Sequence, residues 1–317
     1  MKQPIEASLG GTSYPADPEE LLGFLREAFD LPGAPPWPVE ADQPTDKQPA
    51  DPGLLGVIAP HIDLRVSRVA YAHAFAPLLR VAPVPHYLIL GVGHRCRQEW
   101  AVDGRSWHTA LGTIAADPTL AEFLGRELGP ELLADPGAFH REHSIEFPLV
   151  WLQAIHRLRG LEPDFRIAPV LCGGLYGLLL GENEEAEWER LRQLGSALAQ
   201  WCERCQKEGG VRVIVSIDGC HEGSRFDHDY PVTPARQKQT RAWEDFFWRY
   251  VERHDADGLI GFLRQDMNAR YFDGVGACLL LLEMLGRNFR LERSHYEQWV
   301  EPRDRSMVTF TSAALTR

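Results

Sequence analysis

The chain has 317 residues, with 33 Lys and Arg against 45 Asp and Glu, which gives a formal net charge of −12. The acidic balance argues against a nucleic-acid partner, which requires a Lys/Arg surplus on some face. The lack of a long apolar run and of an apolar N-terminal segment argues against a membrane span and a signal peptide. Six irregularly spaced Cys indicate reduced thiols and predict a cytoplasmic protein.

The N-terminal part is predicted to contain one helix and a connector. Residues 18–30 place apolar side chains at helical spacing and predict an amphipathic helix. Residues 31–53 contain seven of the 23 Pro and are typical of an extended connector. Residues 54–317 are predicted to form the main body. We therefore expect a single domain over residues 1–317, with an N-terminal segment at residues 1–30.

Short apolar runs alternate with helical patterns through the main body. The runs predicted as strands are 54–60, 86–93, 166–174, 211–218 and 307–313. The segments predicted as helices are 67–80, 118–128, 144–158, 186–207, 235–253 and 275–286. Apolar runs without alternation suit strands that are buried on both faces. The order predicts an α/β fold, with a largely parallel central sheet flanked by helices.

Three of the predicted strands end close to a histidine: His61, His94 and His221. In open α/β sheets, ligands bind beyond the carboxyl ends of the strands. His61 and His94 can each offer a nitrogen to a metal, or each can simply hydrogen-bond a neighbouring loop. Asp273 precedes an apolar helix, where it is either a third metal ligand or an N-cap residue. Two His and one carboxylate suit non-haem iron(II) or zinc, with coordination positions left open.

Two further polar clusters are candidates for acid/base chemistry. Asp218 lies three residues before His221 and would orient its imidazole as a general acid/base; the alternative is a hydrogen bond that stabilises the loop. His143 directly precedes a predicted helix that Ser144 would cap, with Pro148 in its first turn. His143 is then a proton donor or substrate contact at the pocket rim, or part of a solvated helix start.

One cysteine motif is not predicted to be functional. Cys202 and Cys205 form a Cys-x-x-Cys pair, but the pair lies inside a helical pattern and no second pair accompanies it. We therefore expect neither zinc binding nor redox chemistry from the motif itself.

Seven segments form an ordered series along nearly the whole chain: GGTSYPADPEEL (10–21), VIAPHID (57–63), LGVGH (90–94), TALGTIAAD (109–117), EHSIEFPLVWLQ (142–153), IAPVLCG (167–173) and SIDGCHEG (216–223). This series resembles the Memo-like family, also called AmmeMemoRadiSam system protein B. Members of that family are similar in fold to class III extradiol dioxygenases. The resemblance implies one α/β domain with a pocket at the strand ends.

The resemblance also implies a site. It implies metal ligands at His61 and His94, and an acid/base imidazole at His221. The family's third ligand is a Cys in a Cys-Gly pair, and the matching position here is Asp273, followed by Gly274. A carboxylate in place of a thiolate favours a harder metal, iron(II) or manganese, over copper(I).

Some positions depart from the family pattern. Arg65 and Arg68 stand where the family tends to have an aromatic residue and a glycine. Either Arg could hold an anionic substrate through a bidentate pair, or it could be an exposed helix residue. Arg65, Arg68 and Glu142 are the tentative substrate contacts.

The leading hypothesis is a non-haem iron(II)-dependent, dioxygenase-like oxidoreductase that acts on an unidentified small-molecule or peptide substrate. Its metal ligands would be His61, His94 and Asp273, with zinc and manganese as alternative ions. One alternative is a zinc-dependent hydrolase that uses His221 as the base. Another is a non-catalytic module that binds a peptide or ligand.

Overall fold

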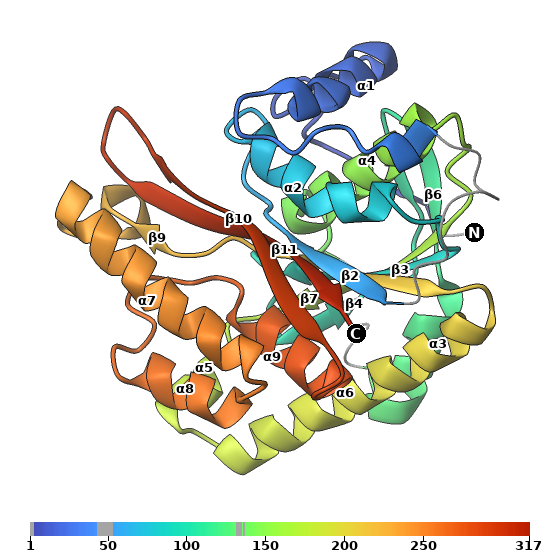
Figure 1. Cartoon of the computed structure of the whole chain (residues 1–317). Helices are drawn as coiled ribbons and strands as arrows, with labels where there is room; N and C mark the ends of the chain where they lie inside the picture. Colours follow the sequence, from blue (N-terminus) through green and yellow to red (C-terminus); the bar gives the residue numbers. More distant parts are fainter. Residues whose placement is uncertain (1–2, 43–52, 131–134, 136) are drawn as a thin grey trace.

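A mixed sheet of eleven strands organises the part of the chain that the computed structural model describes, residues 3–42, 53–130, 135 and 137–317 (Figure 1). Its centre is parallel. In spatial order the central strands are β7 (Arg166–Cys172), β3 (His86–Val92), β8 (Val211–Ser216) and β2 (Leu54–Ala59). Nearly all of their residues are buried, which explains their continuous apolar sequences. The predicted α/β fold with a largely parallel central sheet is confirmed.

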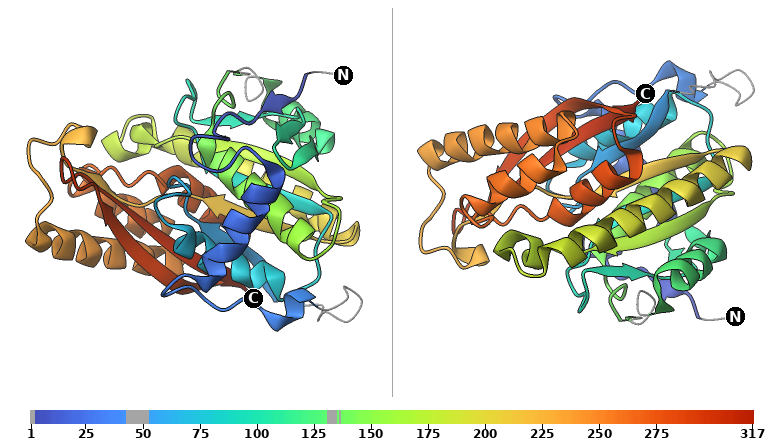
Figure 2. Two further views of the ribbon diagram at one scale, coloured as in Figure 1. Left: turned by 90° about the horizontal axis from the view of Figure 1, so that it is seen from above. Right: turned by 90° about the horizontal axis from the view of Figure 1, so that it is seen from below.

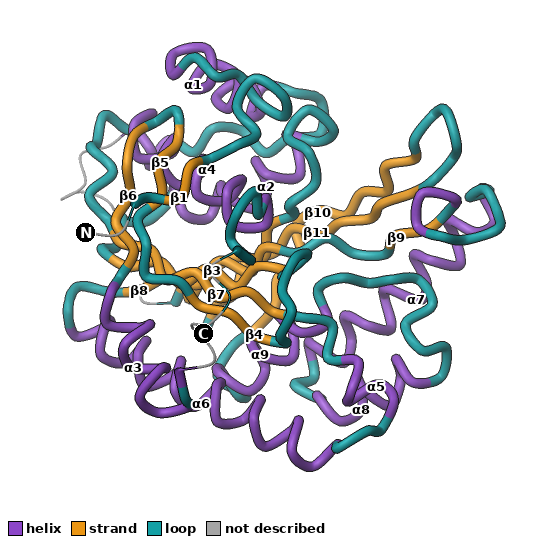
Figure 3. The backbone as a smooth tube through the Cα atoms, turned by 180° about the vertical axis from the view of Figure 1, so that it is seen from behind, coloured by secondary structure: helices purple, strands orange, loops and turns teal. Residues whose placement is uncertain are grey.

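Antiparallel strands extend the sheet beyond β2. β11 (Met307–Thr316) pairs with β2, and β10 (Arg290–Val300) pairs with β11 at the sheet edge. Figure 3 shows this hairpin reaching past the parallel strands, beside α7 (Pro234–Glu252) and β9 (His221–Glu222). β10 was not predicted, because its residues are exposed or half-buried and its sequence is polar.

Short strands complete the opposite side of the sheet. β6 (Gly112–Ala116) runs parallel to β7, and β5 (Trp107–Thr109) pairs antiparallel with β6. Beyond them β1 (Ile5–Glu6) pairs with β5, and β4 (Trp100–Val102) pairs with β7. These strands are too short to leave a recognisable pattern in the sequence.

Helices cover both faces of the sheet, as predicted (Figure 2). One face carries α1 (Pro18–Arg26), α2 (Arg68–Leu79) and α4 (His143–Leu158). Their apolar side chains form one hydrophobic core, which includes Leu21, Tyr71, Phe75 and Trp151.

The other face is covered by the remaining helices: α3 (Pro118–Leu128), α5 (Tyr176–Leu180), α6 (Glu184–Lys207), α7, α8 (Ala256–Arg264) and α9 (Val275–Leu285). α9 is apolar on all sides because it lies between the sheet and α6. Gly195 of α6 permits that close approach, since a Cβ there would lie 2.7 Å from the Cβ of Glu283. The burial of α9 fixes the loop before it, which carries Asp273.

The connector is described only in part. Residues 31–42 include a short 3-10 helix, Val39–Asp42, whereas residues 43–52 of the predicted connector lie outside the described residues. Among the described residues, no helix combines the length and the apolar character that crossing a membrane requires. The six Cys are free thiols.

Candidate metal centre at the strand ends

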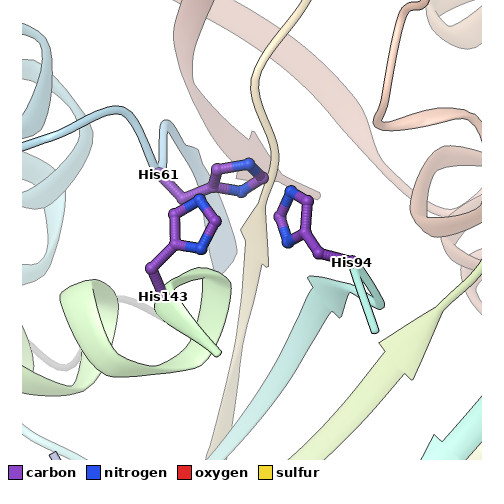
Figure 4. Close-up of side chains that lie close together, drawn as sticks. All are labelled: His61, His94 and His143. Carbon is purple, nitrogen blue, oxygen red and sulfur yellow. The ribbon is translucent and has the colours of Figure 1, made fainter. Parts of the chain in front are cut away.

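Three imidazoles meet at the carboxyl edge of the parallel strands (Figure 4). His61 follows β2, His94 follows β3, and His143 is the first residue of α4. The ring of His61 lies 5.1 Å from that of His94 and 5.0 Å from that of His143, centroid to centroid. One nitrogen from each ring lies within 4.8 Å of the other two. The two strand-end imidazoles proposed as ligands are therefore close together, and His143 stands beside them.

Asp273 joins this group from the loop before α9. Its Oδ2 lies 3.0 Å from Nε2 of His61. The N-cap of α9 is Gly274, so Asp273 does not cap that helix. Apart from this contact with His61, both carboxylate oxygens are buried without a hydrogen-bond partner among the described residues, although 15% of the side chain is exposed. A buried carboxylate without hydrogen bonds is costly unless a cation compensates it.

His61 is held in one orientation by the neighbouring strand β8. Its Nδ1 donates to the carbonyl of Ser216 at 3.2 Å, which leaves Nε2 directed toward Asp273. Asp218 supports the same loop, because its Oδ1 accepts from the backbone N–H of His61 at 2.9 Å and of Ile62 at 3.1 Å. An imidazole whose second nitrogen is already hydrogen-bonded presents the first one to a metal in a fixed direction.

His94 is held in a similar way by Glu142. Nδ1 of His94 donates to Glu142 Oε1 at 2.9 Å, and the backbone N–H of His94 donates to Oε2 at 3.2 Å. Glu142 is also the N-cap of α4 and accepts from the N–H of Ser144. The expected capping by Ser144 is wrong: its hydroxyl donates to the carbonyl of Val92 at the end of β3. Pro148 accordingly lies in the second turn of α4 rather than in the first.

Glu142 and the two arginines do not take up the substrate positions expected of them. Glu142 is buried and fully engaged with His94 and α4. Arg65 is largely exposed and pairs with Asp63 at 3.0 Å. Arg68 donates to the carbonyl of Phe24 at 2.7 Å and lies over its ring, so it joins α2 to the N-terminal segment.

His221 is oriented by backbone carbonyls instead of by Asp218. Its Nδ1 lies 3.0 Å from the carbonyl of Gly219 and 3.2 Å from that of Tyr271. In the described part of the chain, the hydrogen bonds of Asp218 go to the loop after β2. The expected Asp218–His221 pair is therefore corrected.

Clustered charges shift the ionisation of this group. Burial lowers the pKa of His61, but Asp218 and Asp273 outweigh it and raise that pKa to about 10. Burial, together with His61 and His94, lowers the pKa of His143 to about 3. Burial raises the pKa of Asp273, but His61 more than offsets this and brings it to about 2. In the absence of a metal ion, the positive charge of protonated His61 therefore offsets the negative charge of the neighbouring carboxylates.

The donor set fits a divalent metal. His61 and His94 each have one nitrogen committed to a protein acceptor and the other available, and Asp273 supplies the carboxylate oxygens that lack partners. Two imidazoles and a carboxylate on one side of an ion leave its other positions for substrate or solvent. These features define an α/β protein with a candidate metal centre where its parallel strands end.

The chain belongs to the Memo-like protein family, whose model matches residues 6–314. It is 26% identical to a MEMO1 family protein of Thermus thermophilus over 286 residues, which cover 90% of this chain and 74% of the relative. A MEMO1 family protein of Aquifex aeolicus is 24% identical over 88% of this chain, but the match spans only 64% of that relative. One from Methanopyrus kandleri is 29% identical over 75% of this chain and 73% of its own length.

One structural link near the site was not predicted. The carboxylate of Glu146, one turn into α4, accepts from the hydroxyl of Tyr14 at 2.6 Å and from the backbone N–H groups of Ser8 and Leu9. These bonds fix the N-terminal segment over the start of α4, where His143 lies. Tyr14 and Glu146 both stand in the segments that carry the family resemblance, which was the available signal.

Proposed function

We propose that this chain is an iron(II)-dependent oxidoreductase whose metal ligands are His61, His94 and Asp273. The observation that carries the proposal is the buried Asp273 carboxylate, whose one partner among the described residues is the His61 ring, 3.0 Å away, beside His94 and His143. This carboxylate faces imidazoles whose second nitrogens are already hydrogen-bonded to the protein. Such an arrangement suits a metal centre, because the ligands are oriented before the ion binds.

The ligand chemistry supports iron(II) over softer ions. Nitrogen and oxygen donors without a thiolate suit iron(II) and manganese better than copper(I), and two His with one carboxylate form the usual set of non-haem iron oxygenases. Iron(II) held in this way would supply redox chemistry with dioxygen. The oxidative reaction is proposed partly by analogy with proteins of similar fold, whereas the ligand set rests on geometry.

The surrounding residues divide between orientation and proton transfer. Glu142 and Asp218 are buried and hold His94 and the loop of His61 in place. His143 is 35% exposed and its ring stacks on that of His94 at 4.4 Å, so substrate and solvent can reach it. We assign proton transfer to His143 and His221, because each has an imidazole nitrogen that no described contact commits to the fold.

Substrate would approach from the exposed side of His94, which is 34% exposed, and of His143. The substrate class is a small molecule or a peptide. The protein would cover the ion on the side of its ligands. The reaction would therefore take place on the opposite side, where the His143 ring is exposed.

The test is metal content in anaerobically prepared, full-length protein. His61→Ala with His94→Ala should remove one equivalent of iron, whereas His108→Ala, at an exposed histidine of β5, should not. Anomalous scattering from crystals at the iron and zinc edges should place iron beside His61, His94 and Asp273. Iron content that the double substitution leaves unchanged would refute the ligand assignment. Zinc retained at this position without oxygen uptake would favour the hydrolase instead.

A further inference from the structure

A second group of possible metal ligands lies at the opposite edge of the sheet, where the parallel strands begin. His86 is the first residue of β3, Asp117 is the N-cap of α3, and Cys205 is in the last turn of α6. One donor atom from each lies within 4.8 Å of the other two. All three residues are more than nine-tenths buried. The structure thus gathers a nitrogen, an oxygen and a sulfur donor from three separate elements.

The contact between His86 and Asp117 is not an ordinary hydrogen bond. Nδ1 of His86 lies 3.2 Å from Oδ2 of Asp117, yet it is buried without a hydrogen-bond partner, because the carboxylate lies off the direction in which the ring N–H points. Ligands about 2.0 Å from a tetrahedral zinc ion stand about 3.3 Å from one another. The spacing of these two atoms is therefore that of two ligands on one ion.

Neighbouring groups prepare Asp117 and His86 for this role. Oδ1 of Asp117 accepts from the N–H of Thr119 at 2.8 Å and from its hydroxyl at 2.6 Å, which leaves Oδ2 on the side of His86. Nε2 of His86 lies 3.9 Å from a carboxylate oxygen of Glu208. That distance is too long for a hydrogen bond, so Glu208 attracts the ring electrostatically and does not hold it as the usual partner of a ligating histidine does.

We propose that His86, Asp117 and Cys205 bind a zinc ion. Zinc accepts nitrogen, oxygen and thiolate ligands together, whereas magnesium and calcium require oxygen alone. The ion would join β3, α3 and α6 at their ends, and three protein ligands would leave its fourth position to a water molecule. This site is independent of the proposed oxidoreductase centre, which lies at the other end of β3 and contains no thiolate.

Metal binding must displace the proton of Cys205. Burial and the nearby Asp117 carboxylate raise the pKa of this thiol to about 12, so the metal-free protein carries it protonated at neutral pH. A bound zinc ion stabilises the thiolate and releases that proton. Cys202, three residues earlier on the same helix, is not part of the cluster and provides a matched control.

The test is a titration of the metal-free, full-length protein with Co²⁺, whose complexes with thiolates absorb in the near ultraviolet. A thiolate band that appears with Co²⁺ and disappears when Zn²⁺ is added is expected for the wild type and for Cys202→Ser. In His61→Ala with His94→Ala, where the first site cannot compete for Co²⁺, the band should saturate at one equivalent. Cys205→Ser should abolish it. In a His61→Ala and His94→Ala background, where the first site cannot bind the ion, Zn²⁺ should also raise the midpoint of thermal unfolding when Cys202→Ser is added and leave it unchanged when Cys205→Ser is added.

The wild-type titration is decisive even if Cys205→Ser does not fold. A wild type that shows no thiolate band would overturn the proposal and leave an ion pair between His86 and Asp117. A band that persists in both Cys205→Ser and His86→Gln would also overturn it, since the thiolate would then belong to another cysteine.

Discussion

The two ends of β3 carry histidines in very different surroundings. His94, just beyond its last residue, is 34% exposed and faces a group of imidazoles, whereas His86, its first residue, is buried beside a thiol and a carboxylate. The first group is accessible from solvent, whereas the second is shielded from it. One strand therefore presents an open site at one edge of the sheet and a closed site at the other.

The supporting groups differ in the same way. At the open site, buried carboxylates orient the histidines: Glu142 holds His94, and Asp218 holds the loop of His61. At the closed site, support comes from the Thr119 hydroxyl and from Glu208, which is largely exposed. A buried charged group affects a bound metal more than a neutral or solvent-exposed group does. Substitutions of the supporting residues should therefore change metal affinity more at the open site than at the closed site.

The largest expected effect is at Asp273. Asp273→Asn should lose iron(II) at the open site, because an amide is a weak ligand and carries no charge. Asp273→Cys should keep a metal but shift the preference toward zinc or copper(I), since a thiolate is a softer donor. Metal analysis and competition titrations measure both. Equal iron binding by wild type and Asp273→Asn would mean that His143 serves as the third ligand.

Replacement of the buried support should have the next largest effect. Glu142→Gln keeps one acceptor oxygen for the His94 ring and the N–H of Ser144, which share Oε1. It replaces Oε2, the acceptor of the backbone N–H of His94, with an amide NH2 and removes the charge behind the His94 ring. We expect iron(II) affinity to fall by roughly 100-fold, the upper range for such partners of a ligating histidine. The cobalt–thiolate band of the closed site should not change. A change in both sites would indicate that the substitution disturbs the sheet as a whole.

Much of the fold could be predicted because the information was local. Continuous apolar runs predicted β2, β3, β7 and β8, since strands buried on both faces need no polar alternation. β10 has the opposite character: it lies at an edge and is polar. Nothing in its own sequence distinguished it from a loop, because its pairing with β11 defines it.

The position of the open site could be predicted from the sheet topology, but the hydrogen bonds within the site could not. Parallel strands end at a common edge, so residues after β2 and β3 had to lie near one another. Which group Asp218 contacts depends on the path of the loop backbone, and that path directs it to the N–H groups of His61 and Ile62. The closed site joins residues far apart in sequence, which no spacing motif could reveal.

A smaller effect is expected from the neutral support of the closed site. Thr119→Ala removes the hydroxyl that donates to Asp117 but keeps the backbone N–H that also donates to it. Cobalt affinity should fall roughly tenfold, and Thr119→Ser should restore it. Iron(II) binding at the open site should be unaffected. An affinity that Thr119→Ala leaves unchanged would show that Asp117 needs no fixed orientation, which argues against its role as a ligand.

The last prediction concerns the stability of the metal-free open site rather than its affinity for a metal. The pKa of His61 rises from 6.5 to about 10 on folding, since its carboxylate neighbours outweigh the effect of burial. A raised pKa contributes stability that is fully present below the unfolded value and is lost as pH rises toward the folded value. The thermal midpoint of metal-free protein should therefore fall between pH 6.5 and pH 10.

Asp273→Asn should flatten this decline, because it removes one of the charges that raise the pKa of His61. Glu162→Gln, at an exposed position, should not flatten it. Parallel curves for the wild type and Asp273→Asn would show that Asp218 alone sustains the proton on His61, and would weaken the case that Asp273 is directed at the same point as the imidazoles.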